Sequence, residues 1–560
     1  MNEIRKNWDF VFPIIAVVVA IIATICNFTY GLDTLYDEGC HCLDMLSSIT
    51  DGAIPGDDRT WWSDIFLTLF GCNICSSVVS LRVVKLCVAI LTSLLFWLLT
   101  WDVAKTKGEK IGYLSVIMLF SILTMGGIMV CYNSMSQFLF VISCGVLYRM
   151  NKTENDTHRI LFALLLGCLL TFSLFAIIVS GVVVSAAMLF LIVYRYWKSW
   201  KQMFSVLGAM TGGLVVTLLW VHIFAIPLQQ VWDNIMDIGQ AITKVGRGYD
   251  PISMGVQMML FLRDLTLCVI TLIGINYLSE KVRYHSVRWI AGLCYVSLFL
   301  VYAHYQTKPQ VTASMLLCVL WVQALWAKYN EKAERIVWKH IFRYEHVFNI
   351  FLMAFPMLAV LGTVVYIGLK MTWFIIPWVF LAWRLGFAEK RNIMRAETLI
   401  AISLLMLVPS VKTLRSIDPS QDVIQCGALK GMHLTPEQAA HFEKVDSIVA
   451  EYDFKKNESV FFTTQLSMAT VCYLEAIPCG FYFEIMSFLA HADANTPKPD
   501  FIFMNDYDHT IGAEYMHQIG WGWPDEFDKY YIGTPETATG LGYSTERWLY
   551  CRTRLQKNAK

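Results

Sequence analysis

Long apolar runs separated by short polar stretches dominate the sequence. A membrane-spanning helix needs about 20 mostly apolar residues, and such runs begin near residues 11, 81, 112, 132, 160, 178, 203, 260, 289, 310, 347, 372 and 397. The first run, from Phe12 to Phe28, could be mistaken for a signal peptide, but it lacks a small-residue cleavage site and an acidic segment follows it. The pattern therefore predicts a polytopic α-helical membrane protein with about 13 transmembrane helices.

Basic residues alternate between the loops that join these runs. One set of loops holds 23 Lys and Arg, and the opposite set holds 5. The basic set consists of the N-terminus and the segments near 105–110, 149–159, 195–201, 281–288, 328–343 and 384–395. Cytoplasmic loops carry the excess of Lys and Arg in membrane proteins. We therefore expect a cytoplasmic N-terminus and, because the number of spans is odd, a C-terminal segment on the external side.

Composition excludes two broad classes of protein. Hydrophobic residues make up 56% of the 560 residues and charged residues 16%, whereas soluble proteins carry about 25% charged residues. The net charge is zero, and no stretch shows the dense basic face that binding to nucleic-acid phosphates requires. A soluble multidomain enzyme and a nucleic-acid-binding protein are both excluded.

Two regions lie outside the predicted spans. The first is an external loop over residues 31–80, and the second is the acidic tail, residues 411–560. The tail combines an amphipathic segment, Pro436–Tyr452, with short apolar runs at 459–463, 500–504 and 548–552. This alternation predicts a small C-terminal α/β extracytoplasmic domain, large enough to bury its own core, after a transmembrane domain over residues 1–410.

Eight of the 16 cysteines fall in these two external regions. They are Cys40, Cys42, Cys72 and Cys75 in the loop, and Cys426, Cys472, Cys479 and Cys551 in the tail. An oxidising compartment permits disulfides there, but the sequence does not choose among the pairings. The spacing of Cys72 and Cys75 also occurs in metal and redox pairs, although no matching His/Cys cluster follows at the spacing of a zinc site.

Acidic side chains crowd the first external loop. Eight occur by residue 64, against the single base Arg59: Asp33, Asp37, Glu38, Asp44, Asp51, Asp57, Asp58 and Asp64. A carboxylate held at the membrane surface can have its pKa raised toward the working range of a general base. The alternative is a solvated loop whose acids only follow the charge asymmetry of the chain.

The context of Asp37 and Glu38 resembles a known family. Tyr36-Asp37-Glu38-Gly39 follows the first span by eight residues, and Gly52-Ala-Ile-Pro-Gly-Asp-Asp58 follows later in the loop. Together with Ser80-Leu81-Arg82 and the Tyr-Asn-Ser-Met segment at 132–135, this order resembles the GT-C superfamily of integral-membrane glycosyltransferases, in its protein O-mannosyltransferase and lipid A aminoarabinose transferase branches. Gly56 departs from that pattern, in which an aromatic residue is usual.

The resemblance implies an inverting glycosyltransferase with a polyprenyl-phosphate-linked sugar donor and a lipid, glycan or protein acceptor, in the inner membrane of a bacterium with a periplasmic C-terminal domain. Asp37 would take the proton of the acceptor, and Glu38 would orient the acceptor or serve as the base. The resemblance fixes no cofactor, and the use of a divalent metal stays open. No nucleotide-sugar site is indicated, because a Gly-rich phosphate loop is absent from the sequence.

Cations must hold the leaving phosphate in such a reaction, and intramembrane or interfacial charge is costly enough to indicate function. The candidates are Arg82, Lys85, Arg263 and Lys308. The remaining candidates, for contacts with the acceptor or the sugar, are Asp58, Tyr132, Asn133, His304 and Tyr305. Arg82 and Lys85 can instead snorkel to the headgroups, Arg263 can form a structural ion pair, and Lys308 can be an exposed loop charge.

Other membrane proteins must be weighed against this interpretation. A transporter or flippase of lipid-linked glycans would show repeated halves and charges near the bilayer midplane, neither of which the sequence displays. A polysaccharide polymerase or ligase shares the lipid-linked substrate, but its large loop is typically found between late spans. A non-catalytic scaffold on the same fold would not need Asp37 and Glu38.

The charge asymmetry predicts the topology directly. A reporter that is active only outside the cytoplasm should be active when fused after Lys560 and silent when fused after Lys201, because basic loops are retained in the cytoplasm. The measurement is reporter activity in whole cells with matched expression of both fusions. The reverse pattern would place all the candidate residues at the wrong leaflet.

Overall fold

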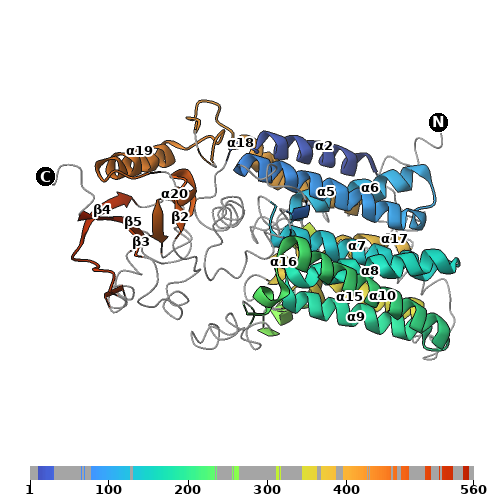
Figure 1. Ribbon diagram of the computed structural model, residues 1–560. Helices are drawn as coiled ribbons and strands as arrows, with labels where there is room; N and C mark the ends of the chain where they lie inside the picture. The colour runs from blue at the N-terminus through green and yellow to red at the C-terminus, as the bar shows by residue number, and fades with distance from the viewer. Residues whose placement is uncertain are drawn as a thin grey trace, which may run out of the picture.

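The computed structural model describes residues 10–30, 65, 68–69, 77–125, 130–233, 235, 255–256, 258–260, 262–263, 266, 311–313, 316, 343–361, 367–385, 395–425, 427, 429–455, 458–462, 468–478, 498–505, 516–517, 520–533 and 547–553. A helical bundle occupies one side of the molecule, and the tail forms a separate α/β unit beyond α18 (Figure 1). Both units have buried apolar cores.

The bundle consists of helices that begin close to the predicted runs. Its members are α2 (Val11–Cys26), α5 (Val78–Thr100), α6 (Lys107–Thr124), α7 (Tyr132–Lys152), α8 (Asp156–Ala176), α9 (Ile178–Tyr196), α10 (Trp200–Trp220), α15 (Tyr344–Ala359), α16 (Ile367–Trp373), α17 (Ile376–Arg384) and α18 (Arg395–Arg415), with short η3 (Trp101–Val103) and η4 (Val221–Ala225) segments. Among the described residues, five helices are long and apolar enough to cross a membrane. The chain is therefore a helical membrane protein.

Sequence signals account for several helix boundaries. Capping boxes begin α5 at Ser77 and α6 at Thr106, where side-chain oxygens accept the first N–H groups of the helix. The apolar run near residue 372 is two helices, because α16 ends at Trp373 and α17 restarts with Pro377 in its first turn. Proline has no N–H to continue a helix but suits its first turn.

Helices of the bundle pack on partners that are near and distant in sequence. Helix α5 packs on α6 and α7, α8 lies between α7 and α10, and α2 packs on α6 and on α18. Figure 1 shows α2 and α18 side by side along one edge of the bundle. This arrangement places the basic turns at 105–110, 149–159 and 195–201 at one end of the bundle. The C-terminus of α2 and the N-termini of α5 and α7 lie at the other end.

Five buried hydroxyl groups of the bundle are satisfied within their own helices. The side chains of Thr92, Ser93, Thr100, Thr171 and Ser403 are buried and each donates to the carbonyl four residues earlier. An apolar surrounding makes an unsatisfied polar group costly. These bonds allow small polar residues to sit in helices that are otherwise apolar.

The described part of the tail contains a five-stranded mixed sheet and two helices. Helix α19 (Pro436–Glu451) begins with a capping box at Thr435 and coincides with the predicted amphipathic segment. Helix α20 (Met468–Tyr473) is short. The strands are β1 (Ser459–Phe462), β2 (Ile477–Pro478), β3 (Phe501–Asn505), β4 (Phe527–Gly533) and β5 (Arg547–Arg552). Their order is β2-β1-β3-β5-β4, with β1 parallel to β2 and β3, and with β5 antiparallel to β3 and β4. The three apolar runs predicted in the tail become β1, β3 and β5.

Helices α8 and α10 approach closely through glycine. A Cβ atom built on Gly213 would lie 2.2 Å from the carbonyl oxygen of Leu164, and one built on Gly167 would lie 2.2 Å from that of Met210. The thiol of Cys168 also donates to the carbonyl of Gly213 at 3.5 Å. Small residues at such crossings let helix backbones pack directly in membranes. By contrast, no described residue has an atom within 4 Å of the Cβ position at Gly212.

This packing predicts a difference between two adjacent glycines of α10. Gly213→Ala should separate α8 from α10 and lower the free energy of unfolding by about 1–3 kcal/mol. Gly212→Ala is the matched control and should leave stability unchanged or raise it slightly, since alanine favours the helix. Thermal unfolding of both purified variants in the same detergent measures the effect. Equal unfolding temperatures would contradict the close approach.

Candidate active site

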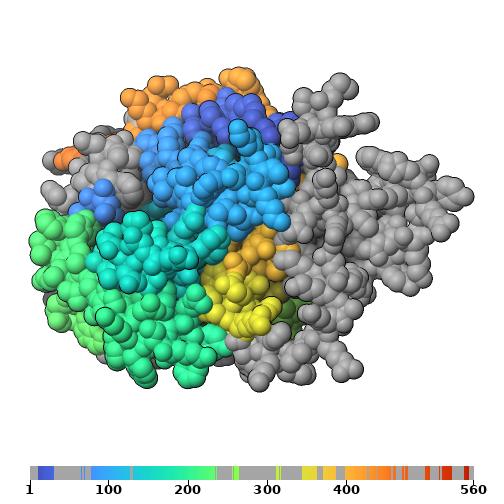
Figure 2. Space-filling model, turned by 90° about the vertical axis from the view of Figure 1, so that its right-hand side faces the viewer, coloured from blue at the N-terminus to red at the C-terminus, as the bar shows by residue number. Residues whose placement is uncertain are grey.

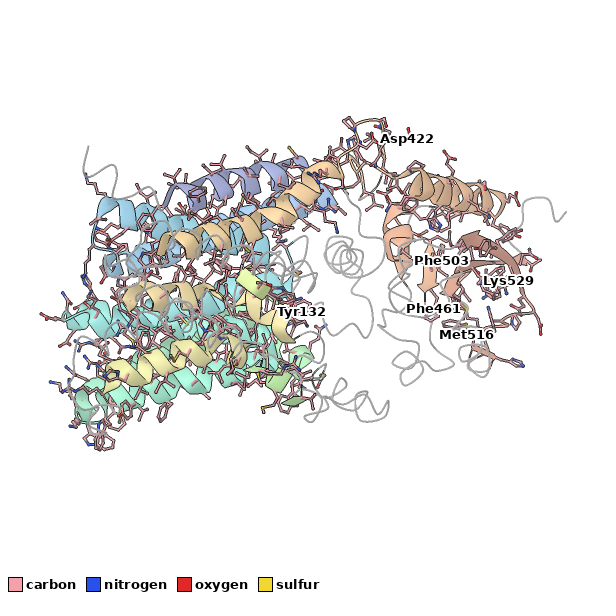
Figure 3. The ribbon with its side chains drawn as sticks, turned by 180° about the vertical axis from the view of Figure 1, so that it is seen from behind. Tyr132, Asp422, Phe461, Phe503, Met516 and Lys529 are labelled. Carbon is pink, nitrogen blue, oxygen red and sulfur yellow. The ribbon has the colours of Figure 1, made fainter. Side chains whose placement is uncertain are left out.

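The candidate site lies at the end of the bundle that faces the tail. The C-terminus of α2 and the N-termini of α5 and α7 meet there, and Tyr132 marks this end in Figure 3. The first external loop leaves α2 at this point. Asp37, Glu38 and Asp58, which the sequence places in that loop, lie outside the described residues, as do His304, Tyr305 and Lys308.

Arg82 joins the C-terminal end of α2 to α5. Its side chain is buried, and its Nη1 atom donates to the carbonyl oxygens of Asn27 at 2.9 Å, Phe28 at 3.2 Å and Tyr30 at 2.6 Å. The last carbonyl groups of a helix have no partner within it and carry partial negative charge. A guanidinium at this position satisfies them, so Arg82 fixes the direction in which the chain leaves α2.

The beginning of α7 is attached to the same region. The N–H of Val130 donates to the carbonyl of Leu81 at 3.2 Å, which brings the α7 N-terminus beside Arg82. Ser134 completes a capping box with Cys131, and the side chain of Asn133 is buried while Tyr132 is half-buried. The structure thus places two pairs of predicted site residues next to each other. One pair is Arg82 with Lys85 on α5, and the other is Tyr132 with Asn133 on α7.

A hairpin of the tail covers the other side of the α2 terminus. Val423 and His433 form an antiparallel bridge, and the N–H of His433 donates to the carbonyl of Thr29 at 2.6 Å. The imidazole of His433 stacks on the ring of Tyr30, with ring centroids 4.1 Å apart and planes 7° apart. The tail therefore contacts the residues that immediately precede the acidic loop.

Lys85 and Arg263 differ in exposure. Lys85 is half-buried one turn after Arg82 on α5, and Arg263 is exposed. The structure therefore brings Lys85 close to Arg82 along the helix, whereas no described contact places Arg263 with them. Within the described ranges, no group of three or more His, Cys, Asp or Glu side chains is arranged to hold a metal ion.

Gln137 is a polar residue that the sequence analysis did not single out. It lies one turn after Asn133 on α7, is completely buried, and neither its amide oxygen nor its amide nitrogen has a hydrogen-bond partner among the described residues. Buried polar groups without partners are rare in folded proteins. A polar residue in an apolar run is the signal that could have identified it.

Cys551 is the one cysteine of the tail whose side chain is described. It is a free thiol, fully buried on β5, and burial raises the pKa of its thiol above the ordinary value. The thiolate is the reactive form of cysteine. Cys551 therefore acts as a core residue of the tail domain.

Comparison with known proteins gives matches at the level of structure. No protein-family model matches the chain, and no curated protein sequence matches it. The crystal structure of ArnT from Cupriavidus metallidurans in the apo state is similar over 99% of this chain and 99% of that chain, at 10% identity and a TM-score of 0.35. ArnT from the same organism bound to undecaprenyl phosphate is similar over 97% of this chain and 98% of that chain, at 10% identity and a TM-score of 0.34.

The position of Arg82 predicts a structural effect that Lys85 does not share. Arg82→Gln should lower the free energy of unfolding by about 1.5–3 kcal/mol, because three carbonyl groups at the α2 terminus lose a charged donor. Lys85→Gln, a substitution of the same type one turn away, should change it by less than about 0.5 kcal/mol. Thermal unfolding and limited proteolysis after residue 30 measure both. Equal behaviour of the two variants would remove the structural role of Arg82.

Proposed function

We propose that the chain is a GT-C-type glycosyltransferase that moves a sugar from a polyprenyl-phosphate carrier to an acceptor at the external face of a bacterial inner membrane. The observation that carries this proposal is the set of bonds from Arg82 to the C-terminal end of α2, which the acidic segment follows in sequence. The cation is buried at the point where an acidic Asp-Glu loop leaves the first span. In this proposal the chain has about 13 spans, a cytoplasmic N-terminus and a periplasmic tail domain.

The proposed reaction is a single displacement. Asp37 accepts the proton of the acceptor hydroxyl or amine as that atom attacks the anomeric carbon of the sugar. The bond between that carbon and the phosphate oxygen breaks, and the polyprenyl phosphate leaves with the electron pair. Attack from the face opposite the phosphate inverts the configuration, and Glu38 orients the acceptor.

Cations around the loop would stabilise the leaving phosphate. Arg82 and Lys85 lie on one face of α5 near the membrane surface, and we assign Lys308 and Arg263 to the same task from the other side. Charge-assisted hydrogen bonds to phosphate are among the stronger polar contacts in proteins. The bonds of Arg82 to the α2 terminus hold it in a fixed position, which limits the reorganisation needed when the donor binds.

Polar residues of α7 are the proposed contacts for sugar and acceptor. Tyr132 and Asn133 lie at the helix start, and the buried amide of Gln137 lies one turn further on. An amide can both donate and accept, as sugar hydroxyls require. Asp58, His304 and Tyr305 complete the proposed set from the loops.

The proposal predicts that the two loop acids are essential for transfer. Asp37→Asn preserves size but cannot accept a proton, so the rate should fall about a hundredfold to ten-thousandfold. Donor binding should survive, because cations elsewhere hold the phosphate. Membranes containing each variant, supplied with a labelled polyprenyl-phosphate sugar, report transfer and binding separately.

Glu38→Gln and Asp51→Asn serve as matched variants in the same loop. Loss of transfer in Glu38→Gln alone would exchange the roles of Asp37 and Glu38 and keep the site. Asp51→Asn should transfer at the parental rate. If all three variants transfer at that rate, the proposed site is wrong and a transporter or scaffold becomes the better interpretation.

A further inference from the structure

A cavity of about 250 Å³ opens at the other end of the bundle, away from the candidate active site. It lies between the C-terminus of α7, the N-terminus of α15 and the C-terminus of α17. Its walls include Tyr148, Lys152, Tyr344, Glu345, Phe348 and Arg384. Figure 2 looks onto this end of the bundle and shows α15 in yellow beside α17 in orange-yellow.

Positive charge exceeds negative charge around this cavity. Lys152 and Arg384 line it, Arg149 lies 3.4 Å from Asp102, and the guanidinium of Arg195 lies 5.1 Å from the ring centre of Tyr344. Against these four cations, the described acidic residues in the cluster are Asp102 and Glu345. The first turn of α15 adds the partial positive charge of a helix N-terminus. The surroundings of the cavity therefore favour an anion.

Arg384 is held in a fixed orientation. Its guanidinium lies 5.7 Å from the ring centre of Tyr148 and 5.4 Å from that of Phe348, and its Nε atom donates to Asn349 at 2.9 Å. Glu345 pairs with it, but the side chain of Glu345 is 64% exposed. A guanidinium offers five N–H groups in a planar fork suited to phosphate. Glu345 can turn into solvent when an anion takes its place.

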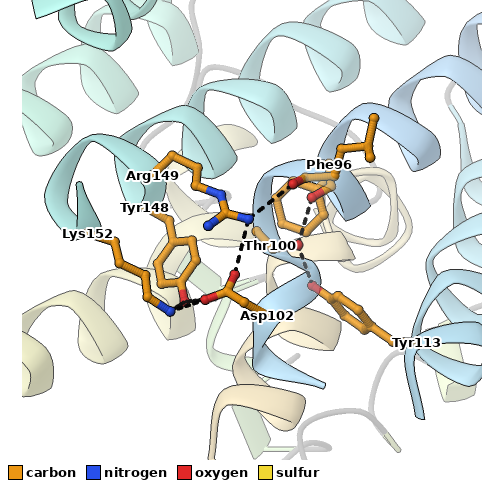
Figure 4. Close-up of polar contacts among 8 residues, drawn as sticks. Phe96, Thr100, Asp102, Tyr113, Tyr148, Arg149 and Lys152 are labelled. Carbon is orange, nitrogen blue, oxygen red and sulfur yellow. Dashed lines mark hydrogen bonds and ion pairs between the residues drawn. The ribbon is translucent and has the colours of Figure 1, made fainter. Parts of the chain in front are cut away.

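Lys152 is equally able to exchange partners. It pairs with Asp102, whose carboxylate also accepts from Tyr148 at 2.9 Å and faces Arg149 (Figure 4). Asp102 thus keeps two partners if the ammonium turns away. The side chain of Lys152 is 52% exposed, so it reaches the cavity from its open side. An incoming anion would leave no buried carboxylate without a partner.

This end of the bundle lies at the level of lipid headgroups. Trp197 and Trp200, in the adjacent turn between α9 and α10, are 58% and 65% exposed, and Lys110 lies 3.8 Å from the ring centre of Trp101. Exposed tryptophans beside basic residues are typical of the membrane interface. The cavity is also smaller than the roughly 300–1,000 Å³ of pockets for drug-sized ligands, which suits a headgroup.

We propose that this cavity binds the phosphodiester headgroup of an acidic phospholipid, with Arg384 and Lys152 on the phosphate and the rings of Tyr148 and Phe348 against the glycerol. Basic pockets between membrane helices bind such headgroups. The site is separate from the sugar-transfer site. This proposal rests on the proposed function in one respect only, which is the assignment of this end of the bundle to the cytoplasmic leaflet.

The test uses the full chain, purified and delipidated in detergent. Titration with short-chain phosphatidylglycerol should raise the unfolding temperature and give a saturable adduct in native mass spectrometry. Short-chain phosphatidylcholine at equal concentration should do neither. Inorganic phosphate is the third arm: if it matches phosphatidylglycerol, the ligand is a soluble phosphate and the lipid assignment is overturned.

Variants separate this site from general electrostatic attraction. Lys152→Gln and Arg384→Gln should each weaken phosphatidylglycerol binding about tenfold to a hundredfold. Lys198→Gln removes an exposed cation at the same end, stacked on Trp197, and should bind as the parent does. If Arg384→Gln fails to fold, Lys152→Gln carries the test, since its side chain is half exposed. Equal binding by Lys152→Gln and Lys198→Gln would overturn the proposal, whatever the outcome of the sugar-transfer assay.

Discussion

A helix that ends at the membrane surface must satisfy its last carbonyl groups, and in this protein one buried arginine does so. Arg82 bonds to Asn27, Phe28 and Tyr30 and thereby couples the end of α2 to the start of α5. Buried backbone groups without partners are costly. The course of residues 27–30 after α2 therefore depends on this contact.

The tail also contacts the residues that follow α2. The stack of His433 on Tyr30 and the bond to Thr29 place a hairpin of the tail directly on the residues that precede the loop. Asp422 marks this hairpin between the two units in Figure 3. The α/β unit and the bundle are therefore joined at the α2 terminus as well as through α18.

The apolar pattern was sufficient to predict where most described helices begin. The runs near 11, 132 and 178 start within a residue of α2, α7 and α9, because about 20 apolar residues have one stable form in a bilayer. The run near 372 is divided, and Pro377 is the physical reason. In the tail, short apolar runs predicted strands but not their order, since the pairing of β3 with β5 depends on contacts distant in sequence.

The candidate site was predictable only in part. Arg82 stood out as a charge in a span, but its carbonyl partners lie more than 50 residues away in sequence, and no local pattern shows them. Gln137 and the cluster around Asp102 escaped notice for a similar reason, because their significance comes from burial and from neighbours on other helices. The roles of Asp37 and Glu38 stay predictions of the sequence.

Photolabelling with a polyprenyl phosphate that carries a photoreactive group near its phosphate tests the location of the donor site most directly. Labelled peptides would be mapped by mass spectrometry in membranes that contain excess phosphatidylglycerol, so that the cavity at the other end is occupied. We expect the label at residues 77–85 and 130–137, where α5 and α7 begin beside Arg82. Label confined to residues 148–152 and 344–348 would place the donor at the opposite end of the bundle and contradict this account.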